Sequence, residues 1–317
     1  MNLELYLHSR FLDKSIITNN VHFKTFTIVN VLGKFNLSGI VKKLNFKGRY
    51  SVMEDENVQD ALLKELAGLE YLLVSYSGGI DSTLLALFAQ KVLQDKVKCV
   101  LFDAPLVPRR AIKEAKKNAR KFGLSCSIIP FPILENEEFR KNSPNRCYIC
   151  KKQSARILKD QAEKLGISKI ADGINASDLD EYRPGLQASN EEGILHPFLS
   201  LGIQKKQIRQ LAQECGFDFW NKPSASCLAS RIPYGEEITV EKLQIIEHAE
   251  DLLHDLGFSN LRVRLHGKIA RIELLPEEFE KGVNMRDKIL EVLQDCGFSY
   301  IALDLKGYRS GSLDEVL

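Results

Sequence analysis

Hydrophobic and polar positions along residues 54–235 predict strands and helices in alternation. Four short, continuous apolar runs are typical of strands that are buried on both faces of a parallel sheet. These runs lie at residues 71–76, 97–102, 125–131 and 168–171. Between them apolar residues recur at helical spacing, as at Ile112, Ala115 and Ala119. The pattern predicts an α/β fold with a doubly wound, mostly parallel sheet, whose ligands bind outside the carboxyl ends of the strands.

The order of the predicted elements changes after about residue 235. A helix comes first, then two strands, a second helix and a last strand, which indicates a smaller α+β domain. These elements lie at residues 239–256, 261–265, 269–274, 277–294 and 300–305. We therefore predict a basic N-terminal extension (1–53), an α/β domain (54–235) and a C-terminal α+β domain (236–317) for substrate binding or oligomerisation.

Composition and charge narrow the class of protein. The chain has 317 residues, of which 44% are hydrophobic and 27% charged, the balance of an ordinary globular protein. Its formal charge of +2 is too small to indicate binding to nucleic acid or to a membrane surface. No apolar run reaches the roughly 18–20 residues of a membrane span, and the N-terminus lacks the pattern of a signal peptide. We therefore expect a cytoplasmic location, where closely spaced cysteines are metal ligands or catalytic thiols rather than disulfides.

The first 52 residues differ from the rest in charge. They carry eight Lys and Arg residues but only Glu4 and Asp13 as acids. The segment is therefore either a basic appendage that contacts RNA or another anion, or an accessory segment before a functional start at Met53.

A glycine-rich turn between a predicted strand and a predicted helix carries the strongest chemical signal. Gly78 and Gly79 allow the backbone to turn tightly and to present N–H groups to an anion, at the N-terminus of the next helix. Ser77 and Ser82 add hydroxyl donors, and Asp81 can hold a magnesium ion (Mg²⁺) that carries phosphates. The alternative is an ordinary glycine turn with a capping side chain. The arrangement predicts a nucleotide-binding loop, and the sequence contains neither a Walker loop nor a Gly-x-Gly-x-x-Gly motif.

The segment Ser77–Ser82 resembles the PP-loop of the ATP pyrophosphatase superfamily. The resemblance implies an adenine nucleotide alpha hydrolase-like domain that binds ATP, transfers AMP to a substrate oxygen and releases pyrophosphate. It also implies that Asp103, at the end of the second predicted strand, lies near the adenosine.

Three cysteines add a second kind of chemistry. Cys147 and Cys150 form a Cys-x2-Cys pair before a predicted helix, and Cys227 lies in a loop of small residues with Arg231 four positions further on. Three thiolates can hold three irons of a 4Fe-4S cluster and leave the fourth iron open. The alternatives are a redox pair, a zinc site that lacks one ligand, and cysteines that only pack in the core.

The segments around these cysteines resemble the LarE-type sulfur transferases, a narrower PP-loop family. The similar segments are Arg146–Lys151, Asp172–Ala176, Tyr182–Gly185, Lys222–Gly235, Arg262–Arg264, Ile269–Glu273 and Leu303–Gly311. They occur in order between about residues 54 and 312, across both predicted domains.

The resemblance implies a role in making the nickel-pincer nucleotide cofactor. ATP adenylates a carboxylate of pyridinium-3,5-biscarboxylic acid mononucleotide, and a sulfur nucleophile displaces AMP to give a thiocarboxylate. Asp172 and Gly173 are implied at the ATP site. The sulfur comes either from Cys227 itself or from a cluster held by Cys147, Cys150 and Cys227, and the presence of all three cysteines favours the cluster. Implied partners are a small-molecule nucleotide, a second copy of the chain and a downstream nickel-insertion enzyme.

A phosphorylated substrate needs basic side chains, and three arginines are candidates. Arg262 and Arg264 share one face of a predicted strand, which suits a phosphate clamp, and Arg231 lies near the cysteine. The alternative is a pair of solvated strand arginines. Arg183 either contacts substrate or fixes a turn, and the family resemblance places a metal-binding acid at Glu250, whose alternative is a surface helix carboxylate.

Two other functions compete with this interpretation. One is a tRNA thiolase, which also combines a PP-loop with three cysteines and would bind RNA with a steep salt dependence. The other is a non-catalytic scaffold that binds a nucleotide or a cluster. Release of pyrophosphate on addition of the dicarboxylated nucleotide would exclude the scaffold.

Overall fold

The computed structural model describes residues 58–317 except 181–183, 222–225, 310 and 317. The predicted basic extension lies outside the described residues. Residues Val52–Leu317 form one compact unit, which contains both sheets of the structure. The predicted boundary near residue 235 stays a prediction.

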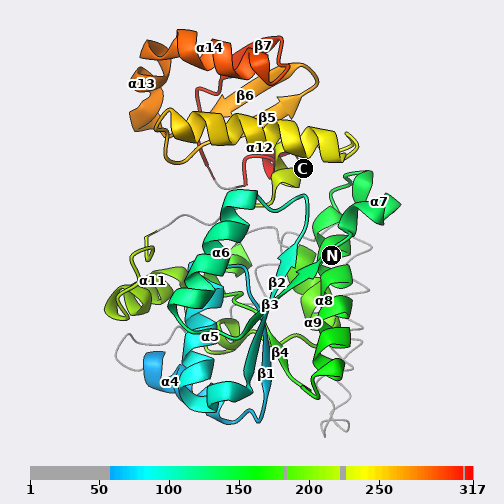
Figure 1. Ribbon diagram of the computed structural model, residues 1–317, viewed down its shortest axis with the longest axis vertical. Coiled ribbons are helices and arrows are strands. Elements are labelled where there is room, and N and C mark those ends of the chain that lie inside the picture. The colour runs from blue at the N-terminus through cyan, green and yellow to red at the C-terminus, as the bar shows by residue number, and fades with distance from the viewer. Residues whose placement is uncertain (1–57, 181–183, 222–225, 310, 317) are drawn as a thin grey trace, which may run out of the picture. The chain divides into compact units, whose positions relative to one another are not determined.

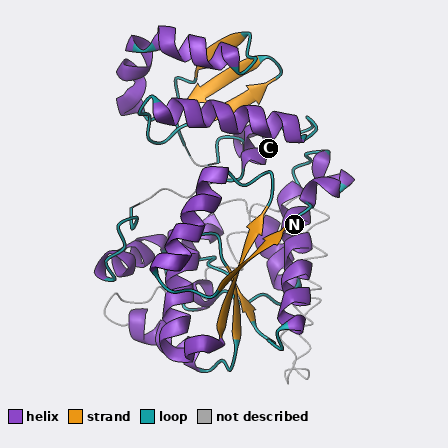
Figure 2. Cartoon of the chain, in the orientation of Figure 1, coloured by secondary structure: helices purple, strands orange, loops and turns teal. Residues whose placement is uncertain are grey.

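A four-stranded parallel sheet forms the centre of the α/β part (Figures 1 and 2). Its strand order is β3-β2-β1-β4. The strands are β1 (Leu72–Ser75), β2 (Val97–Asp103), β3 (Cys126–Pro130) and β4 (Ile170–Ala171). All three strand pairs are parallel, which confirms the predicted doubly wound α/β fold.

Helices cover both faces of this sheet. The α/β part contains α4 (Val58–Ala67), α5 (Ile80–Leu93), α6 (Arg109–Lys121), α7 (Glu137–Arg140), α8 (Arg146–Lys164), α9 (Pro184–Glu191), α10 (Pro197–Ser200) and α11 (Lys205–Glu214). Leu72 and Val74 pack in one apolar cluster with residues of α4, α5, α6 and α11, whereas Leu73 packs in another with residues of α8. Neighbouring strand residues point to opposite faces, so the continuous apolar run in β1 follows from burial on both sides.

A three-stranded sheet with the order β5-β6-β7 forms the C-terminal part. Its elements are α12 (Val240–Asp255), β5 (Arg262–His266), β6 (Ile269–Glu273), α13 (Phe279–Asn284), α14 (Arg286–Asp295) and β7 (Tyr300–Leu303). The predicted α+β order is confirmed, but the single helix predicted at 277–294 is wrong, because α13 and α14 are separated at Met285. Gly282 and Asn284 are weak helix formers just before this break.

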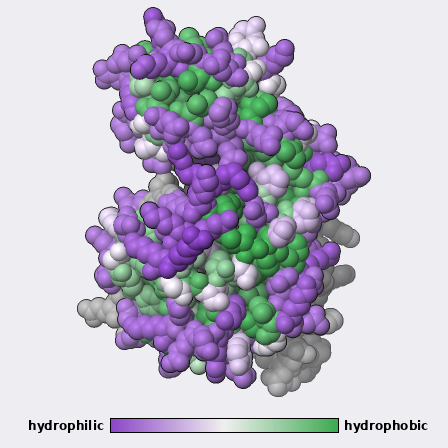
Figure 3. Space-filling view, viewed as in Figure 1, coloured by the Kyte–Doolittle hydropathy of each residue, from purple (hydrophilic) through white to green (hydrophobic). Residues whose placement is uncertain are grey.

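A third apolar cluster joins the carboxyl end of the parallel sheet to the C-terminal elements. It includes Leu106 and Phe131, which follow β2 and β3, together with Leu228, Ile246 of α12 and Val263 of β5. The segment around Cys227 is therefore packed between the sheet end and α12. Figure 3 shows that the face in view is mostly hydrophilic, with hydrophobic side chains confined to patches.

None of the described helices combines the length and the apolar character that a bilayer crossing needs.

Candidate active site

The glycine turn after β1 takes a backbone conformation that other residues rarely adopt. Gly78 has a φ of +76°, and a Cβ at this position would lie 2.3 Å from the Cβ of Ala115 in α6. Such a distance is a hard clash, so only glycine lets the turn approach α6 this closely. The turn is therefore fixed against the helix that follows β2.

Hydroxyl groups brace the loop from inside. The Ser77 N–H donates to Ser82 Oγ at 3.1 Å, the two serine hydroxyls lie 3.0 Å apart, and Thr83 Oγ1 donates to the Gly79 carbonyl at 2.8 Å. Helix α5 begins after Gly79 without any side-chain cap. The uncapped start argues against an ordinary capped turn and leaves helix amides that can bind an anion.

A lysine that the sequence did not reveal faces the acid of this loop. Lys205, the first residue of α11, forms an ion pair with Asp81, and Asn175 donates to the same carboxylate at 3.4 Å. A Cβ on Gly173 would lie 2.9 Å from the Ser82 nitrogen, so this glycine lets the chain after β4 approach the start of α5. The residues after β4 and at the start of α11 thus complete the surroundings of Asp81.

Asp172, predicted at the ATP site, is buried and fully engaged by protein groups. Lys151 Nζ and His196 Nδ1 each lie 2.6 Å from its carboxylate, and Ser189 Oγ donates to it at 3.2 Å. Burial alone would raise the pKa of Asp172, but the Lys151 ammonium and the His196 ring outweigh it and hold the pKa well below its usual range. Asp172 therefore anchors α8 to the end of β4, and its contact with ATP stays a prediction.

Asp103 lies at the carboxyl end of β2, next to the strand that leads into the glycine turn. Arg109 pairs with it, and the same guanidinium donates to the Val107 carbonyl at 2.9 Å. The start of α6 is thereby tied to the end of β2. The predicted location near the adenosine stays a prediction.

The three predicted cysteines come from two segments of the chain. Cys147 and Cys150 lie in the first turns of α8, and Cys227 directly precedes the 3-10 helix Leu228–Arg231. Burial raises the pKa of the Cys150 thiol, and Cys227 and Cys147 raise it further. Cys150 and Cys227 also pack against the same apolar cluster. None of the three forms a disulfide, and Cys147 is exposed whereas Cys150 and Cys227 are partly buried.

The chemistry of this donor set suits an iron–sulfur group, because two segments supply three free cysteines and the buried cation Arg146 directly precedes one of them. Over the described ranges, however, no three or more His, Cys, Asp or Glu side chains are gathered as ligands of a single metal ion. The cluster prediction therefore rests on the kind and number of donors, not on a formed metal site.

Arg231 and Glu250, predicted as a substrate ligand and a metal ligand, form one buried ion pair. Arg231 Nε and Nη2 donate to the two oxygens of Glu250 at 2.8 and 3.1 Å. Glu250 also accepts from the Val263 N–H at 3.0 Å, and Arg231 donates to the Ser226 carbonyl at 3.3 Å. The pair fixes the segment 226–231, called here the cysteine loop, to α12 and β5. Both predicted ligand roles stay untested.

The two strand arginines are buried, so the alternative of solvated arginines is wrong. Arg264 is 1% exposed and donates to both oxygens of Glu273 at 2.8 and 3.0 Å, as well as to the Ser230 carbonyl. Arg262 is 7% exposed, lies over the Tyr308 ring at 4.7 Å and has a buried Nε without a partner in the structure. Of these two strand arginines, Arg262 is the one with a buried donor that has no partner among the described residues. Arg183 lies outside the described residues.

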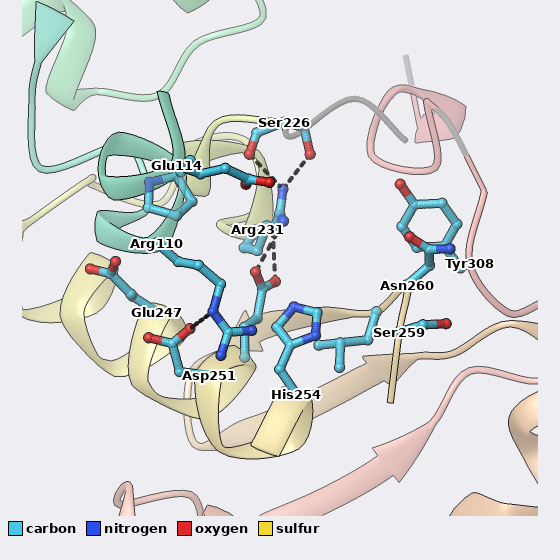
Figure 4. Close-up of a pocket in the computed structure, with 14 residues that line it drawn as sticks. Arg110, Glu114, Ser226, Arg231, Glu247, Asp251, His254, Ser259, Asn260 and Tyr308 are labelled. Carbon is cyan, nitrogen blue, oxygen red and sulfur yellow. Dashed lines mark hydrogen bonds and ion pairs between the residues drawn. The ribbon is translucent and has the colours of Figure 1, made fainter. Parts of the chain in front are cut away.

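A cavity of about 310 Å³ opens beside the cysteine loop (Figure 4). Its walls come from α6, α12, the loop residue Ser226 and Tyr308. Figure 4 shows Arg110 reaching from α6 toward Asp251 of α12, with which it pairs at 3.7 Å. Ser226, the residue before Cys227, is one of the lining residues, so the cavity provides space for a small molecule beside this segment.

One edge of the parallel sheet thus carries the predicted chemistry. The glycine turn, Asp103 and Asp172 follow β1, β2 and β4, and the Leu228 N–H beside Cys227 donates to Leu106 O after β2 at 2.9 Å. Sequence reasoning missed Lys205, Asn175, Lys151 and Arg109, because each acts through a partner that is distant in sequence or lies in a turn. The structure shows a cation that pairs with each predicted acid, and this pairing cannot be seen in the sequence.

A parallel sheet whose first strand leads through a Ser-Gly-Gly turn into an uncapped helix defines an ATP-using enzyme of the PP-loop class. Residues 55–155 match the family model of NAD synthase. The chain is 35% identical over 257 residues to the pyridinium-3,5-bisthiocarboxylic acid mononucleotide synthase of Lactiplantibacillus plantarum, covering 81% of this chain and 93% of that protein. The chain belongs to the family of that synthase, the LarE-type sulfur transferases, and is an ATP-using sulfurtransferase.

Two further relatives cover most of the chain. An uncharacterized protein of Synechocystis sp. is 40% identical over 251 residues, which are 78% of this chain and 94% of that protein. An uncharacterized protein of Methanocaldococcus jannaschii is 33% identical over 248 residues, again 78% of this chain and 94% of that protein. The similarity therefore extends well beyond the residues of the family model.

Proposed function

We propose that this enzyme uses ATP to adenylate a carboxylate of pyridinium-3,5-biscarboxylic acid mononucleotide, and that a sulfur nucleophile then displaces AMP to give a thiocarboxylate for the nickel-pincer nucleotide cofactor. The observation that carries the proposal is the uncapped start of α5 directly after the Ser-Gly-Gly turn. It is supported by the Leu228 N–H, next to Cys227, which donates to Leu106 O after the neighbouring strand β2 at 2.9 Å. The 35% identity to the Lactiplantibacillus synthase supports this choice of substrate.

Adenylation solves a problem of leaving groups. A carboxylate resists attack because its leaving group would be oxide, whereas an acyl-adenylate loses AMP readily. In the proposed ATP complex, the amides of Gly79 and of the start of α5 bind the phosphates. Asp81 would hold a magnesium ion that carries the phosphates, and Lys205, which pairs with Asp81, would neutralise phosphate charge.

The sulfur step needs an ionised sulfur at the cysteine loop. Burial raises the pKa of Cys227 above its usual value and outweighs the Ala229 N–H and the charges of Arg146 and Arg231, which lower it. Binding of the thiol to a metal, or a base from the substrate, would therefore have to remove its proton. The thiolate would form a bond to the acyl carbon while the carbon–oxygen bond to AMP breaks. A 4Fe-4S cluster held by Cys147, Cys150 and Cys227 would instead supply sulfide as the nucleophile.

The substrate's phosphate requires a cation that is not already paired. Arg231 and Arg264 are occupied by Glu250 and Glu273, whereas Arg262 retains a buried Nε donor without a partner in the described structure. We therefore assign the phosphate to Arg262, with the aromatic ring of Tyr308 fixing the guanidinium. The adjoining cavity would hold the rest of the nucleotide.

Replacement of the reactive cysteine separates the two steps. With ATP and the dicarboxylated mononucleotide, Cys227→Ala is expected to release pyrophosphate but to form no thiocarboxylate. A pyrophosphate assay measures the first product and mass spectrometry the second. Cys215→Ala, at an exposed cysteine that ends α11, is the matched control and should behave like the wild type. Thiocarboxylate formation by Cys227→Ala would refute the role of this residue, and a wild type that releases no pyrophosphate would refute the proposed reaction.

The intact mass of the chain after turnover identifies the sulfur source. Loss of one sulfur atom from the chain would show that Cys227 donates its own sulfur and becomes dehydroalanine. An unchanged mass after several turnovers is expected if the sulfur comes from a bound sulfide.

A further inference from the structure

Arg146 is a buried cation whose partners are neutral. It is the first residue of α8 and is 4% exposed. Its Nη1 donates to Asn142 Oδ1 at 2.6 Å, and its guanidinium lies over the Tyr234 ring at 4.6 Å. Neither contact neutralises the charge.

Two other buried cations of the site and the partly buried Lys151 have carboxylate partners, whereas Arg262 has none among the described residues. Arg231 pairs with Glu250, Arg264 with Glu273 and Lys151 with Asp172. No carboxylate among the described residues forms an ion pair with Arg146. Because a buried charge without a counter-charge is costly, a site that keeps one is suited to bind an anion.

The surroundings of Arg146 indicate what kind of anion this is. Cys147 follows it directly, Cys150 lies one helical turn further on α8, and its acceptor Asn142 is bonded to the segment that follows Cys227. The Tyr234 phenol is engaged with Asp314, to which it donates at 2.7 Å, so the cysteines are the side chains beside Arg146 that can ligate an anionic metal group. A cluster with three thiolate ligands carries net negative charge, which would supply the missing counter-charge.

We propose that Arg146 is the counter-ion of an iron–sulfur group ligated by Cys147, Cys150 and Cys227, and that it positions this anionic group toward the cysteine loop. The inference rests on the proposed function, in which these cysteines are the donor set. It adds a positioning residue that contributes charge rather than a metal ligand.

The position of Arg146 is set before any ligand binds. Its acceptor Asn142 is buried in a left-handed conformation with a φ of +53°. Asn142 Nδ2 donates to the carbonyls of Ile232 and Pro233 at 3.2 and 2.7 Å, and the Gly235 N–H donates to the Asn142 carbonyl at 3.0 Å. Asn142 therefore ties Arg146 to the loop that begins at Cys227. A preorganised cation of this kind needs no rearrangement when the anion binds.

Two substitutions separate the charge from the hydrogen bond. Arg146→Lys keeps the positive charge, Arg146→Gln removes it, and both side chains retain an N–H donor for Asn142. Arg156→Gln, at an exposed arginine of the same helix, is the matched control. Each full-length chain is purified without metal under anaerobic conditions, treated with ferrous iron and sodium sulfide, and desalted.

We expect wild type, Arg146→Lys and Arg156→Gln to retain iron and sulfide, and Arg146→Gln to retain several-fold less. Iron that remains in Arg146→Gln should have a more negative reduction potential, because a nearby positive charge favours the reduced form. Thermal unfolding of the metal-free Arg146→Gln chain should occur no lower than in the wild type, since an uncompensated buried charge has been removed.

Three results would overturn the inference. Arg146→Gln could retain as much iron as the wild type, or both Arg146 variants could lose iron and unfold at lower temperature without metal, which would show a merely structural role. The wild type could retain no iron. In that last case pyrophosphate release and sulfur donation by Cys227 remain separately measurable, so failure of the inference is distinct from failure of the proposed function.

Discussion

The nucleotide side and the sulfur side of the candidate site are built on different principles. The nucleotide side is a local structure, in which Ser77, Gly79, Ser82 and Thr83 bond to one another within seven consecutive residues. The sulfur side depends on buried ion pairs between distant segments, such as Arg231 with Glu250. The comparison teaches that the geometry of the glycine turn is determined by neighbouring residues, whereas the geometry of the cysteine loop depends on tertiary packing.

The largest effect on activity is expected from a methyl group added to the glycine turn. Gly78→Ala places a Cβ 2.3 Å from Ala115 Cβ, so either the turn or α6 must move. We expect ATP-dependent pyrophosphate release to fall by about 1,000-fold, because misplaced amides no longer stabilise the phosphates.

Gly123→Ala is the matched control for this substitution. Gly123 also has a positive φ of +64°, but a Cβ there meets nothing within 4 Å. This variant should lose about 1 kcal/mol of unfolding free energy and keep its activity. Equal activities of the two variants would contradict the local account of the loop.

The next effect tests the buried ion pairs of the sulfur side. Arg264→Met leaves the buried Glu273 with the half-buried Arg271 at 3.1 Å and the Ser312 hydroxyl at 3.0 Å, and it removes the donor to the Ser230 carbonyl. We expect a loss of about 3–5 kcal/mol in unfolding free energy, measured by urea denaturation.

An exposed ion pair provides the contrast. Arg286→Met breaks a pair with Asp287 in which both side chains are largely exposed, so its effect should stay below about 0.5 kcal/mol. If Arg264→Met were equally harmless, the cysteine loop would not depend on the buried pair.

A smaller effect is expected at the cation that the sequence did not reveal. Lys205→Gln removes the partner of Asp81, and we expect pyrophosphate release to fall by about 10–100-fold, mainly in kcat, because the charge on the phosphates is less well neutralised. Lys206→Gln, at the exposed neighbouring lysine, should leave steady-state kinetics unchanged. Identical kinetics for the two variants would exclude Lys205 from the nucleotide site.

The smallest effect concerns pH and the Asp172 network. The pKa of Asp172 is lower in the folded chain than its ordinary value of 3.8, so its contribution to stability is present above that value and is lost as the pH falls below it. We expect unfolding free energy, measured in urea from about pH 5 downward, to decline less steeply for Asp172→Asn than for the wild type. Parallel declines would show that Lys151 and His196 do not stabilise this carboxylate.

What could be predicted from the sequence follows the same division between local and distant contacts. The sheet and the glycine turn were predictable because periodicity and adjacent residues specify them. The break at Met285 was not, since apolar spacing continues across it. Arg231, Arg264 and Glu250 were interpreted as ligands from their residue types, but burial and pairing depend on packing across the chain, which a single sequence does not display.

Transfer of an oxygen label tests the central claim most directly. Attack of a substrate carboxylate on ATP and its later displacement by sulfur must leave one carboxylate oxygen on the released AMP. With substrate labelled by oxygen-18 in its carboxylates, we expect one label in AMP for each thiocarboxylate formed, and no labelled AMP without thiocarboxylate. Thiocarboxylate that forms while AMP stays unlabelled would contradict an acyl-adenylate attacked by sulfur in this site.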